Sequence, residues 1–237
     1  MWIDTKHRSN APEIMDNFNM EGEVLRDALD KIAAINHFLG GNKVTISGVE
    51  QLIGNVSHQK TIRIIDIGCG NGDMLRTLSK YGKRKNLNFQ LIGIDANDFT
   101  IAYAKKLSAD YENITYQCRN IFDGELEQCD IVLCTLTLHH FEDQEIVTLL
   151  KNTSKVAHMG IVVNDLHRSA IAYYLFKLVC LIFRLNKMSK DDGLVSILRG
   201  FKKYDLIRYC KQLQLKYCSV SWKWAFRYQW VIKNYEC

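Results

Sequence analysis

From residue 61 to the end of this 237-residue chain, short apolar runs alternate with longer amphipathic stretches. The apolar runs are typical of buried strands and cover residues 62–67, 89–95, 114–119, 131–135 and 160–164. The amphipathic stretches predict helices at about 72–81, 98–109, 142–155, 168–185 and 201–213. Strands joined through helices pair in parallel with right-handed crossovers, so this order predicts a mostly parallel sheet.

Both ends of the chain depart from that alternation. Residues 215–223 and 226–232 are two apolar runs with a short link, which predicts an antiparallel hairpin. Apolar residues between 24 and 35 recur at helical spacing and predict a helix that stops at Gly40-Gly41-Asn42, and a second short helix is expected over 48–53. We therefore expect one α/β, doubly wound, Rossmann-like domain: a mostly parallel seven-stranded sheet with a C-terminal antiparallel hairpin and an N-terminal helical extension.

A glycine-rich turn, DIGCGNGD at residues 66–73, directly follows the first predicted strand. Its glycines permit a tight turn and let a ligand approach the backbone closely. In such a sheet, ligands bind outside the carboxyl ends of the strands. The spacing is not the GxGxxG of dinucleotide sites, and the lysine of a phosphate-binding loop is missing. Asp66 and Asp73 flank the turn and favour a cationic ligand over a pyrophosphate.

The next two strands end in residues that suit a nucleoside. Asp95 ends the second strand, where a carboxylate can accept hydrogen bonds from both hydroxyls of a ribose. Asn120 and Ile121 follow the third strand, where an amide can bond an adenine edge and an apolar side chain can cover its face. Each feature alone also has a structural explanation, since the turn can be a plain strand–helix connection and Asp95 a helix cap. Their order after successive strands favours one shared nucleoside site.

Residues 61–165 resemble the cofactor-binding core of the class I S-adenosylmethionine-dependent methyltransferases. The stretch DIGCGNG matches that family's glycine motif, Asp95 matches its ribose-binding acid, and IVLCTLTLHHF at 131–141 resembles its fourth-strand motif, with the LHH ending common in the ubiquinone/menaquinone-biosynthesis type. The family usually has an aspartate where Asn120 stands, so the charge of that contact differs. The resemblance implies S-adenosyl-L-methionine as cofactor and S-adenosyl-L-homocysteine as product. It implies a cofactor site at Asp66, Gly68, Cys69, Gly70, Gly72, Asp95, Ala96, Asn120, Ile121, Cys134 and Thr135.

A second resemblance covers more of the chain. The stretch NDLHR at 164–168, the long apolar helix after it and ILRGF at 197–201 look like methyltransferases that accompany type III polyketide and aryl-lipid pathways. This implies a small lipophilic aromatic acceptor, a phenol, quinol or polyketide-like molecule. It also implies an N-terminal helical extension or lid at 1–60 and a methyltransferase domain at 61–237, with an acceptor-side insertion at about 166–200.

O-methylation of a phenol needs a base for the hydroxyl proton, and histidine suits that task. His167 after the fifth strand is the first choice for this base and His140 after the fourth is the second. The residues expected to contact the acceptor are His139, Arg168, Tyr173, Tyr174 and Arg199. Two plainer alternatives stay open: Asp165 caps the next helix and leaves His167 exposed, or the helix at 171–185 only covers the sheet. No metal site is expected, because the eight cysteines form no CxxC pair.

Composition describes the surroundings in which the chain works. A net charge of +5 is too small to argue for nucleic acid. Residues 187–237 hold 11 Lys and Arg against 4 Asp and Glu, a face that can meet an anionic membrane or an acidic carrier protein, or simply keep the chain in solution. Residues 171–185 are too short to span a bilayer. No signal peptide is evident, so we expect a cytoplasmic protein with reduced thiols and at most peripheral membrane contact.

Other classes of function compete with an O-methyltransferase. They are a non-catalytic S-adenosyl ligand-binding partner protein, a C-methyltransferase of quinone-type substrates, a nicotinamide oxidoreductase and a nucleic-acid methyltransferase. The glycine spacing disfavours the oxidoreductase. A nucleic-acid methyltransferase usually resembles Asn/Asp-Pro-Pro-aromatic after the fourth strand, where this chain has Cys134-Thr135-Leu136-Thr137.

Overall fold

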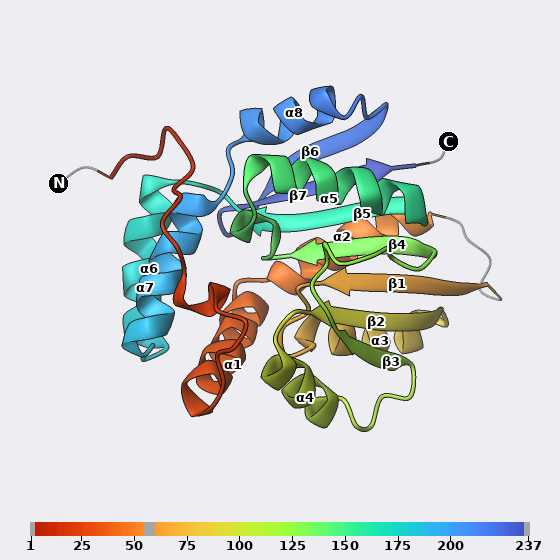
Figure 1. Ribbon diagram of the computed structural model, residues 1–237, viewed down its shortest axis with the longest axis horizontal. Coiled ribbons are helices and arrows are strands. Elements are labelled where there is room, and N and C mark those ends of the chain that lie inside the picture. The colour runs from red at the N-terminus through yellow and green to blue at the C-terminus, as the bar shows by residue number, and fades with distance from the viewer. Residues whose placement is uncertain (1–2, 55–59, 235–237) are drawn as a thin grey trace.

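A computed structural model of the protein describes residues 3–54 and 60–234. Its centre is a seven-stranded sheet in the order β3-β2-β1-β4-β5-β7-β6 (Figure 1). The strands are β1 (Thr61–Ile67), β2 (Asn88–Asp95), β3 (Ile114–Cys118), β4 (Cys129–Thr135), β5 (Ala157–Leu166), β6 (Tyr217–Lys223) and β7 (Arg227–Lys233). Strands β1 to β5 pair in parallel, and β7 pairs antiparallel with both β5 and β6. The expected parallel sheet with its C-terminal hairpin is confirmed.

The helices fall into those that cover the sheet and those that lie at its edge. They are η1 (Ile14–Asp16), α1 (Glu23–Phe38), α2 (Gly41–Ile53), α3 (Asp73–Lys85), α4 (Asp98–Leu107), η2 (Leu138–His140), α5 (Asp143–Val156), α6 (Ala170–Ile182), α7 (Lys187–Arg199) and α8 (Lys203–Gln212). Several begin at a polar cap: the Asn97 side chain accepts from the Thr100 amide at the start of α4.

Two apolar cores lie on opposite faces of the sheet. Ile62 and Ile64 of β1 face the core covered by α2, α3 and α4, whereas Ile65 and Ile67 face the core covered by α5 and α8. In Figure 1, α5 and α8 lie in front of the sheet and α2 and α3 behind it. Because the central strands are buried on both faces, they appear in the sequence as continuous apolar runs, which is why they were predictable.

The remaining helices gather at the carboxyl ends of the parallel strands. There α1, α6 and α7 lie together, and the N-terminal segment (residues 5–16) runs across them (Figure 1). Hydrogen bonds from its backbone amides attach this segment to α7. The Ser9 amide donates to the Leu198 carbonyl at 3.0 Å, and the Ile14 amide donates to Asp192 Oδ1 at 2.8 Å. These elements therefore wall the edge at which a doubly wound sheet binds its ligands.

Two N-terminal helices were expected, and their bounds need correction. The first is confirmed as α1, and the chain turns at Gly40, which has a φ of 75° that suits glycine. The second helix begins at Gly41 rather than at residue 48, because polar residues in its first turns hide its start from an apolar periodicity.

Helix α7 was not predicted. Its sequence is polar at the start and contains Gly193, both of which weaken a helical pattern. The glycine lets α6 and α7 approach closely, because a Cβ at that position would collide with the ring of Phe176. Packing against α6 thus overrides a weak local preference for helix.

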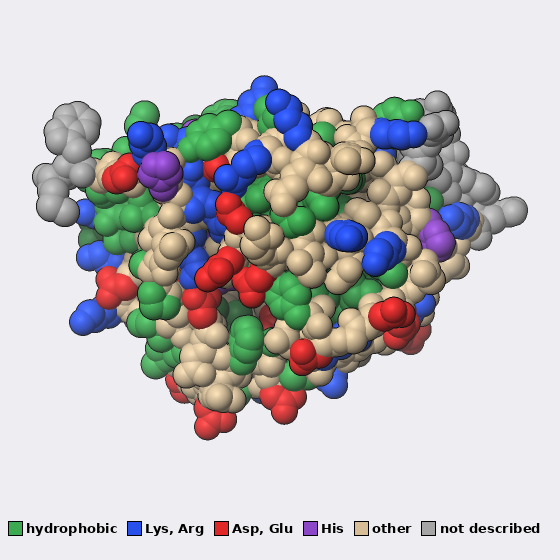
Figure 2. Space-filling view, turned by 45° about the horizontal axis from the view of Figure 1, so that its top comes forward, with side chains coloured by type: hydrophobic (Ala, Val, Ile, Leu, Met, Phe, Trp, Pro, Cys, Tyr) green, Lys and Arg blue, Asp and Glu red, His purple; other side chains and the backbone are tan. Residues whose placement is uncertain are grey.

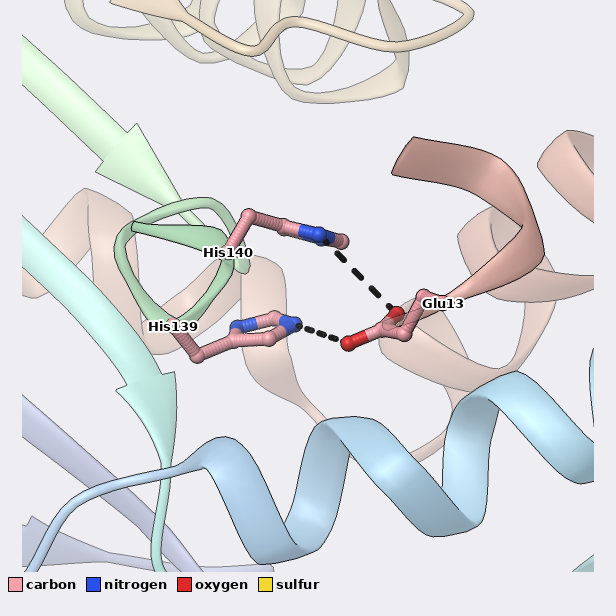
Figure 3. Close-up of side chains that lie close together, drawn as sticks. All are labelled: Glu13, His139 and His140. Carbon is pink, nitrogen blue, oxygen red and sulfur yellow. Dashed lines mark ion pairs between the residues drawn. The ribbon is translucent and has the colours of Figure 1, made fainter. Parts of the chain in front are cut away.

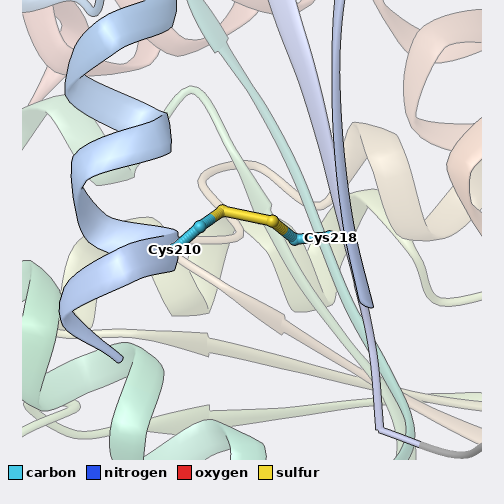
Figure 4. Close-up of a disulfide and its surroundings, with 2 residues drawn as sticks. All are labelled: Cys210 and Cys218. Carbon is cyan, nitrogen blue, oxygen red and sulfur yellow. A yellow bond between two sulfur atoms is a disulfide. The ribbon is translucent and has the colours of Figure 1, made fainter. Parts of the chain in front are cut away.

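The expectation that all cysteines are reduced thiols is corrected by one pair. Cys210 at the end of α8 and Cys218 at the start of β6 form a disulfide, although only eight positions separate them (Figure 4). The short connection between the helix and the hairpin brings the two side chains together. Free thiols are found at Cys69, Cys118, Cys129, Cys134 and Cys180, and Cys237 lies outside the described residues.

Helix α6 carries a stripe of exposed apolar side chains, two of which, Leu178 and Ile182, also line the cavity described below. Its members are Ile171, Tyr174, Leu178, Leu181 and Ile182, all at least 48% exposed. None of the helices in the described part of the chain is both long and apolar enough to span a bilayer. On the face shown in Figure 2, lysine and arginine side chains are interspersed with acidic and apolar ones.

Candidate functional site

A cavity of about 800 Å³ opens at the carboxyl ends of the strands. Its walls come from the glycine turn, the ends of β2, β4 and β5, the N-terminal segment, α1, α6, α7 and the turn before β7. Its size is in the range of small-molecule sites. It brings together one polar region, around the glycine turn, and one apolar region, against α1 and α6.

The glycine turn adopts backbone conformations that favour glycine. Gly68, Gly70 and Gly72 have φ values of 66°, 53° and 77°. Gly68, Cys69 and Gly70, which the resemblance assigns to the cofactor site, line the cavity. Gly72 does not line it: this residue caps α3, and a Cβ there would collide with the hydroxyl of Tyr116. Its role is therefore in packing rather than in ligand contact.

Two acids face the cavity from β1 and β2. Asp95 accepts the Gly70 amide through Oδ2 at 3.1 Å and the Asn97 amide through Oδ1 at 3.0 Å. Asp66 is buried and its Oδ1 has no partner. Burial and the neighbouring Asp95 raise the pKa of Asp66 to about 8, and burial also raises the pKa of Asp95. A cationic ligand would relieve this unfavourable pair of carboxyls.

The third and fourth strands complete the polar region. Ala96, Asn120, Ile121 and Thr135, which the resemblance assigns to the cofactor site, line the cavity. Asn120 uses its Oδ1 to accept the Phe122 amide at 3.0 Å, which leaves its NH₂ group for a ligand. Cys134 does not line the cavity, because it is buried in the core on the face of the sheet that α5 and α8 cover.

A cluster of two histidines and an acid lies beside this region (Figure 3). His139 and His140 come from η2 after β4, and Glu13 comes from the N-terminal segment just before η1. Glu13 Oε1 is 3.8 Å from His139 Nε2, and its Oε2 is 4.0 Å from His140 Nδ1. Burial raises the pKa of Glu13, and its Oε1 has no hydrogen-bond partner.

Each histidine has a carboxylate partner of its own. His139 Nδ1 is 2.7 Å from Asp165 Oδ1, and both side chains are buried. His140 Nδ1 is 2.7 Å from Asp16 Oδ1, and the His140 side chain is 29% exposed. A carboxylate at Nδ1 holds a neutral ring with its proton on that nitrogen, so Nε2 keeps a free lone pair.

The same cluster could hold a metal ion. One ligand atom from each of Glu13, His139 and His140 lies within 4.8 Å of the others. These are ligand types that zinc accepts. Sequence alone did not reveal this group, because Glu13 lies far from the histidines in the chain. An arginine also adjoins it, since Arg199 Nη1 is 3.7 Å from Glu13 Oε1.

Arg168 and Arg199 were expected to contact the acceptor, and this is corrected. Arg168 is 1% exposed, donates to the Thr5 and Gly200 carbonyls and pairs with Asp205 at 3.0 Å. Arg199 donates to the carbonyl oxygens of both histidines and pairs with Asp16 at 2.6 Å. Neither lines the cavity. Both arginines instead hold the N-terminal segment against the body of the protein.

His167, the first-choice base, lines the cavity. Its Nδ1 accepts the indole N–H of Trp222 at 3.2 Å, and its ring contacts Tyr228. Burial lowers its pKa, helped by Lys202 and Arg168. Because Nδ1 accepts a hydrogen bond, the proton of the neutral ring sits on Nε2, so the ring has no free lone pair to offer.

Helix α6 lines the cavity with a different face from the one expected. Ala172, Leu175, Phe176, Leu178, Val179 and Ile182 contribute to the wall. Tyr173 and Tyr174 do not: their rings contact each other edge to face, and the Lys177 ammonium lies over both. The prediction of these two tyrosines as acceptor contacts is corrected, because it chose the wrong helical phase.

Some residues that form the site were missed by sequence reasoning. Glu13 and Asp16 reach it only through the fold of the N-terminal segment. Arg227 at the start of β7 and Asn36 in α1 line the cavity beside Gly41, and the only signal for them was a position next to a predicted turn or helix end. Leu136 lines the polar end with a φ of 55°, which a non-glycine residue rarely adopts.

Comparison with known proteins agrees with this arrangement. Residues 64–160 match a family described as a methyltransferase domain. The ubiquinone biosynthesis O-methyltransferase of Coxiella burnetii (strain RSA 493 / Nine Mile phase I) is 28% identical over 122 residues, 50% of this chain and 47% of that protein. That of Bradyrhizobium diazoefficiens is 36% identical over 85 residues, 35% and 31% of the two chains. The chain thus spans about half the length, or less, of the curated relatives it matches.

Solved structures show the same fold. The plantazolicin methyltransferase BpumL in complex with SAH has a TM-score of 0.65 at 16% identity, over 87% of this chain and 89% of that one. Residues 64–160, which match the methyltransferase-domain family, include the glycine turn, Asp95, His139 and His140, and all of these contribute to the cavity. Residues 64–160 thus resemble a methyltransferase domain, and the described chain has the fold of a methyltransferase solved with SAH.

Proposed function

We propose that the protein transfers a methyl group from S-adenosylmethionine to a hydroxyl of a small lipophilic aromatic acceptor and releases S-adenosylhomocysteine. The observation that carries this proposal is one continuous cavity that joins the glycine turn and Asp95 to a histidine–aspartate pair and an apolar wall. The name of the relatives, O-methyltransferase, supports the reaction type.

The cofactor occupies the polar end of the cavity. Asp95 accepts hydrogen bonds from the ribose hydroxyls, Asn120 and Ile121 meet the adenine, and the amides of the glycine turn face the amino-acid part. The sulfonium and ammonium charges favour the ionised forms of Asp66 and Asp95, which burial otherwise disfavours. S-adenosylhomocysteine lacks the sulfonium charge, so its release is favoured after transfer.

His140 is the base in this proposal, rather than His167. Its Nδ1 is held by Asp16, which leaves the lone pair of Nε2 for a hydroxyl proton. The acceptor oxygen attacks the methyl carbon in line, the C–S bond breaks with its electron pair going to sulfur, and the proton moves to Nε2. The Asp16 carboxylate stabilises the imidazolium that results.

The acceptor lies against the apolar residues of α1 and α6. These include Leu29, Ile32, Leu175, Phe176 and Val179. An aromatic or polyketide-like body fits this lining. A quinone-type acceptor methylated at carbon would fit the same walls, and it needs no base with a free lone pair. The His140–Asp16 pair therefore favours O-methylation.

Contact with a membrane surface is a further part of the proposal. The exposed stripe on α6 is apolar, and the inner face of the same helix lines the acceptor end of the cavity. A lipophilic acceptor could then enter from a bilayer without crossing water. An acidic carrier protein at the basic C-terminal region is the alternative source.

The testing experiment combines binding with turnover. Calorimetric titration should give micromolar binding of S-adenosylmethionine and none of NAD. Incubation with an alkylphenol or alkylcatechol should then add one methyl group, read by mass. His140→Gln should slow transfer by roughly 10²- to 10⁴-fold and His167→Gln should not. Assays with and without a chelator separate a base from a metal ligand at His140. Binding without turnover on any phenolic acceptor would favour the non-catalytic alternative.

A further inference from the structure

Arg227 is a buried cation with nothing to neutralise it. Its side chain is on β7, only 3% of the residue is exposed, and it lines the cavity. Its Nε and Nη1 atoms have no hydrogen-bond partner, and no acid in the described part of the chain forms an ion pair with it. Arg168 and Arg199 are also buried, but all of their side-chain nitrogens have partners, so Arg227 is an exception that needs a reason.

The nearest acid does not serve as its partner. Asp165 exerts a Coulombic effect on Arg227, yet its Oδ1 is bonded to His139 and to the Leu166 amide, and its Oδ2 accepts the His139 amide. Burial lowers the pKa of Arg227 to about 10, so the guanidinium is still charged at neutral pH. An unpaired buried charge is strongly destabilising, so a protein has reason to keep one only where something else pairs with it.

Its surroundings also favour an anion. A Cβ on Gly41 would lie 3.0 Å from Arg227 Cζ, so the guanidinium lies at the first residue of α2, which is the positive end of that helix. Two positive groups therefore meet here. The Asn36 side chain adjoins the same glycine, and its Oδ1 has no donor. The guanidinium therefore lacks an anion among the described residues, and the Asn36 Oδ1 beside it accepts no hydrogen bond from them.

The backbone of Arg227 lies away from the glycine turn. In the sheet order, β7 is three strands from β1 and four from β2, which puts the two backbones roughly 14 Å apart at the usual strand spacing. The guanidinium itself reaches Gly41, and the neighbouring Asn42 donates to Asp73 Oδ2 at 2.7 Å, so the binding experiment must separate a carboxylate of the acceptor from that of the cofactor. Around Arg227 the cavity is lined by Trp224, Phe226 and His167. An aromatic ring can lie against these side chains while an acidic group reaches the guanidinium.

We propose that Arg227 binds a carboxylate of the acceptor, so that the substrate is an aromatic hydroxy acid rather than a neutral phenol. The inference rests on the proposed function and names the substrate class of the same cavity. A guanidinium presents paired N–H donors that match a carboxylate, and the ortho hydroxyl of a resorcylic-type acid can donate to Asn36 Oδ1. This fixes one end of the acceptor and sets which hydroxyl meets the base.

The experiment compares two ligands that differ only in the acid. A pentyl-substituted resorcylic acid and pentylresorcinol, its decarboxylated form, are titrated calorimetrically into the full-length protein with and without S-adenosylhomocysteine. Wild type should bind the acid roughly 10- to 100-fold more tightly, the factor that hydrogen bonds to a charged group supply. Arg227→Met should abolish that preference, Arg227→Lys should retain part of it, and neither should alter S-adenosylhomocysteine affinity.

A stability measurement distinguishes this role from a structural one. Because Arg227 is unpaired in the free protein, Arg227→Met should keep or raise the melting temperature, whereas loss of a structural arginine lowers it. Equal binding of both ligands by wild type, or a preference that survives in Arg227→Met, would overturn the proposal. So would weaker S-adenosylhomocysteine binding in Arg227→Met, since the carboxylate would then be the cofactor's own. Failure of wild type to bind S-adenosylhomocysteine counts against the proposed function. The preference for the acid over pentylresorcinol is measured independently, in the titrations without S-adenosylhomocysteine.

Discussion

Asp16 Oδ1 lies 2.7 Å from His140 Nδ1, across 124 positions of the chain. The N-terminal segment thus supplies the carboxylate that orients a histidine on the loop after β4. Burial alone would raise the pKa of Asp16, but hydrogen bonds from His140, the Glu13 backbone and Arg199 outweigh it and lower that pKa overall. Asp16 is therefore ionised, as its proposed role requires.

Asp16→Asn should slow methyl transfer on the order of 10-fold, because the ring of His140 loses the partner that fixes its proton on Nδ1. The affinity for S-adenosylhomocysteine should not change. Steady-state kinetics and calorimetry check the two statements, with exposed Asp191→Asn on α7 as the matched control. Unchanged turnover in Asp16→Asn would exclude an orienting role.

Asp95→Ala should weaken S-adenosylhomocysteine binding by about 2 kcal/mol, roughly 30-fold, through loss of hydrogen bonds to a charged acceptor. Calorimetric titration measures the change, and Asp110→Ala, at an exposed position in the turn after α4, serves as control. If Asp95→Ala binds as tightly as wild type, the ribose lies elsewhere.

The stability of the ligand-free protein should depend on pH through Asp66. Its pKa is about 8 in the folded state and near 3.8 when unfolded, so between these values the folded state holds the extra proton. The free energy of unfolding contributed by this group is fully present below pH 4 and falls as pH rises toward 8, by up to about 1.4 kcal/mol per pH unit. Urea unfolding at several pH values tests it, and Asp66→Asn should flatten the decline. An identical slope in wild type and variant would mean that Asp66 ionises normally.

Arg168→Met should lower the free energy of unfolding by about 3 kcal/mol or more, because buried Asp205 would lose the cation that it pairs with and the Gly200 carbonyl would lose its donor. The matched control is Arg208→Met, whose pair with Asp143 is half exposed and should contribute less than about 1 kcal/mol. Denaturant titration compares the two. A loss of similar size in both variants would contradict the buried role of Arg168.

The proposed membrane contact predicts that the stripe on α6 binds lipid vesicles. Wild type should sediment with vesicles that contain anionic lipid, and the double variant Leu178→Glu, Leu181→Glu should stay in the supernatant. The matched control is Lys155→Glu on α5, away from the stripe. Equal recovery of all three proteins in the supernatant would remove membrane contact from the proposal.

Most of the sheet was predictable because β1, β2 and β4 are buried on both faces and their apolar runs are continuous. The glycine turn and Asp95 were predictable because both lie at strand ends along a short stretch of chain. Helix α7 was not, because its stability comes from packing on α6 and not from its own sequence.

Long-range pairs account for the errors in the site. Nothing in the sequence connects Asp16 to His140 or Arg199, so a structural arginine looked like a substrate contact. The choice of Tyr173 and Tyr174 over Leu175 and Phe176 was an error of helical phase, since one residue turns a side chain by about 100°. Buried arginines also cannot be told from solvated ones in a sequence, because burial depends on partners that the fold supplies.

The attachment of the N-terminal segment to α7 has a consequence for how the protein is made. Ser9, Ile14 and Asp16 find their partners at Leu198, Asp192 and Arg199. During synthesis these early residues leave the ribosome long before residue 199 exists, so they must wait while the sheet forms. A segment whose Ile14 and Asp16 are translated 178 and 183 positions before their partners is therefore one of the last to settle, and Asp16 is fixed beside the proposed base only after Arg199 has been made.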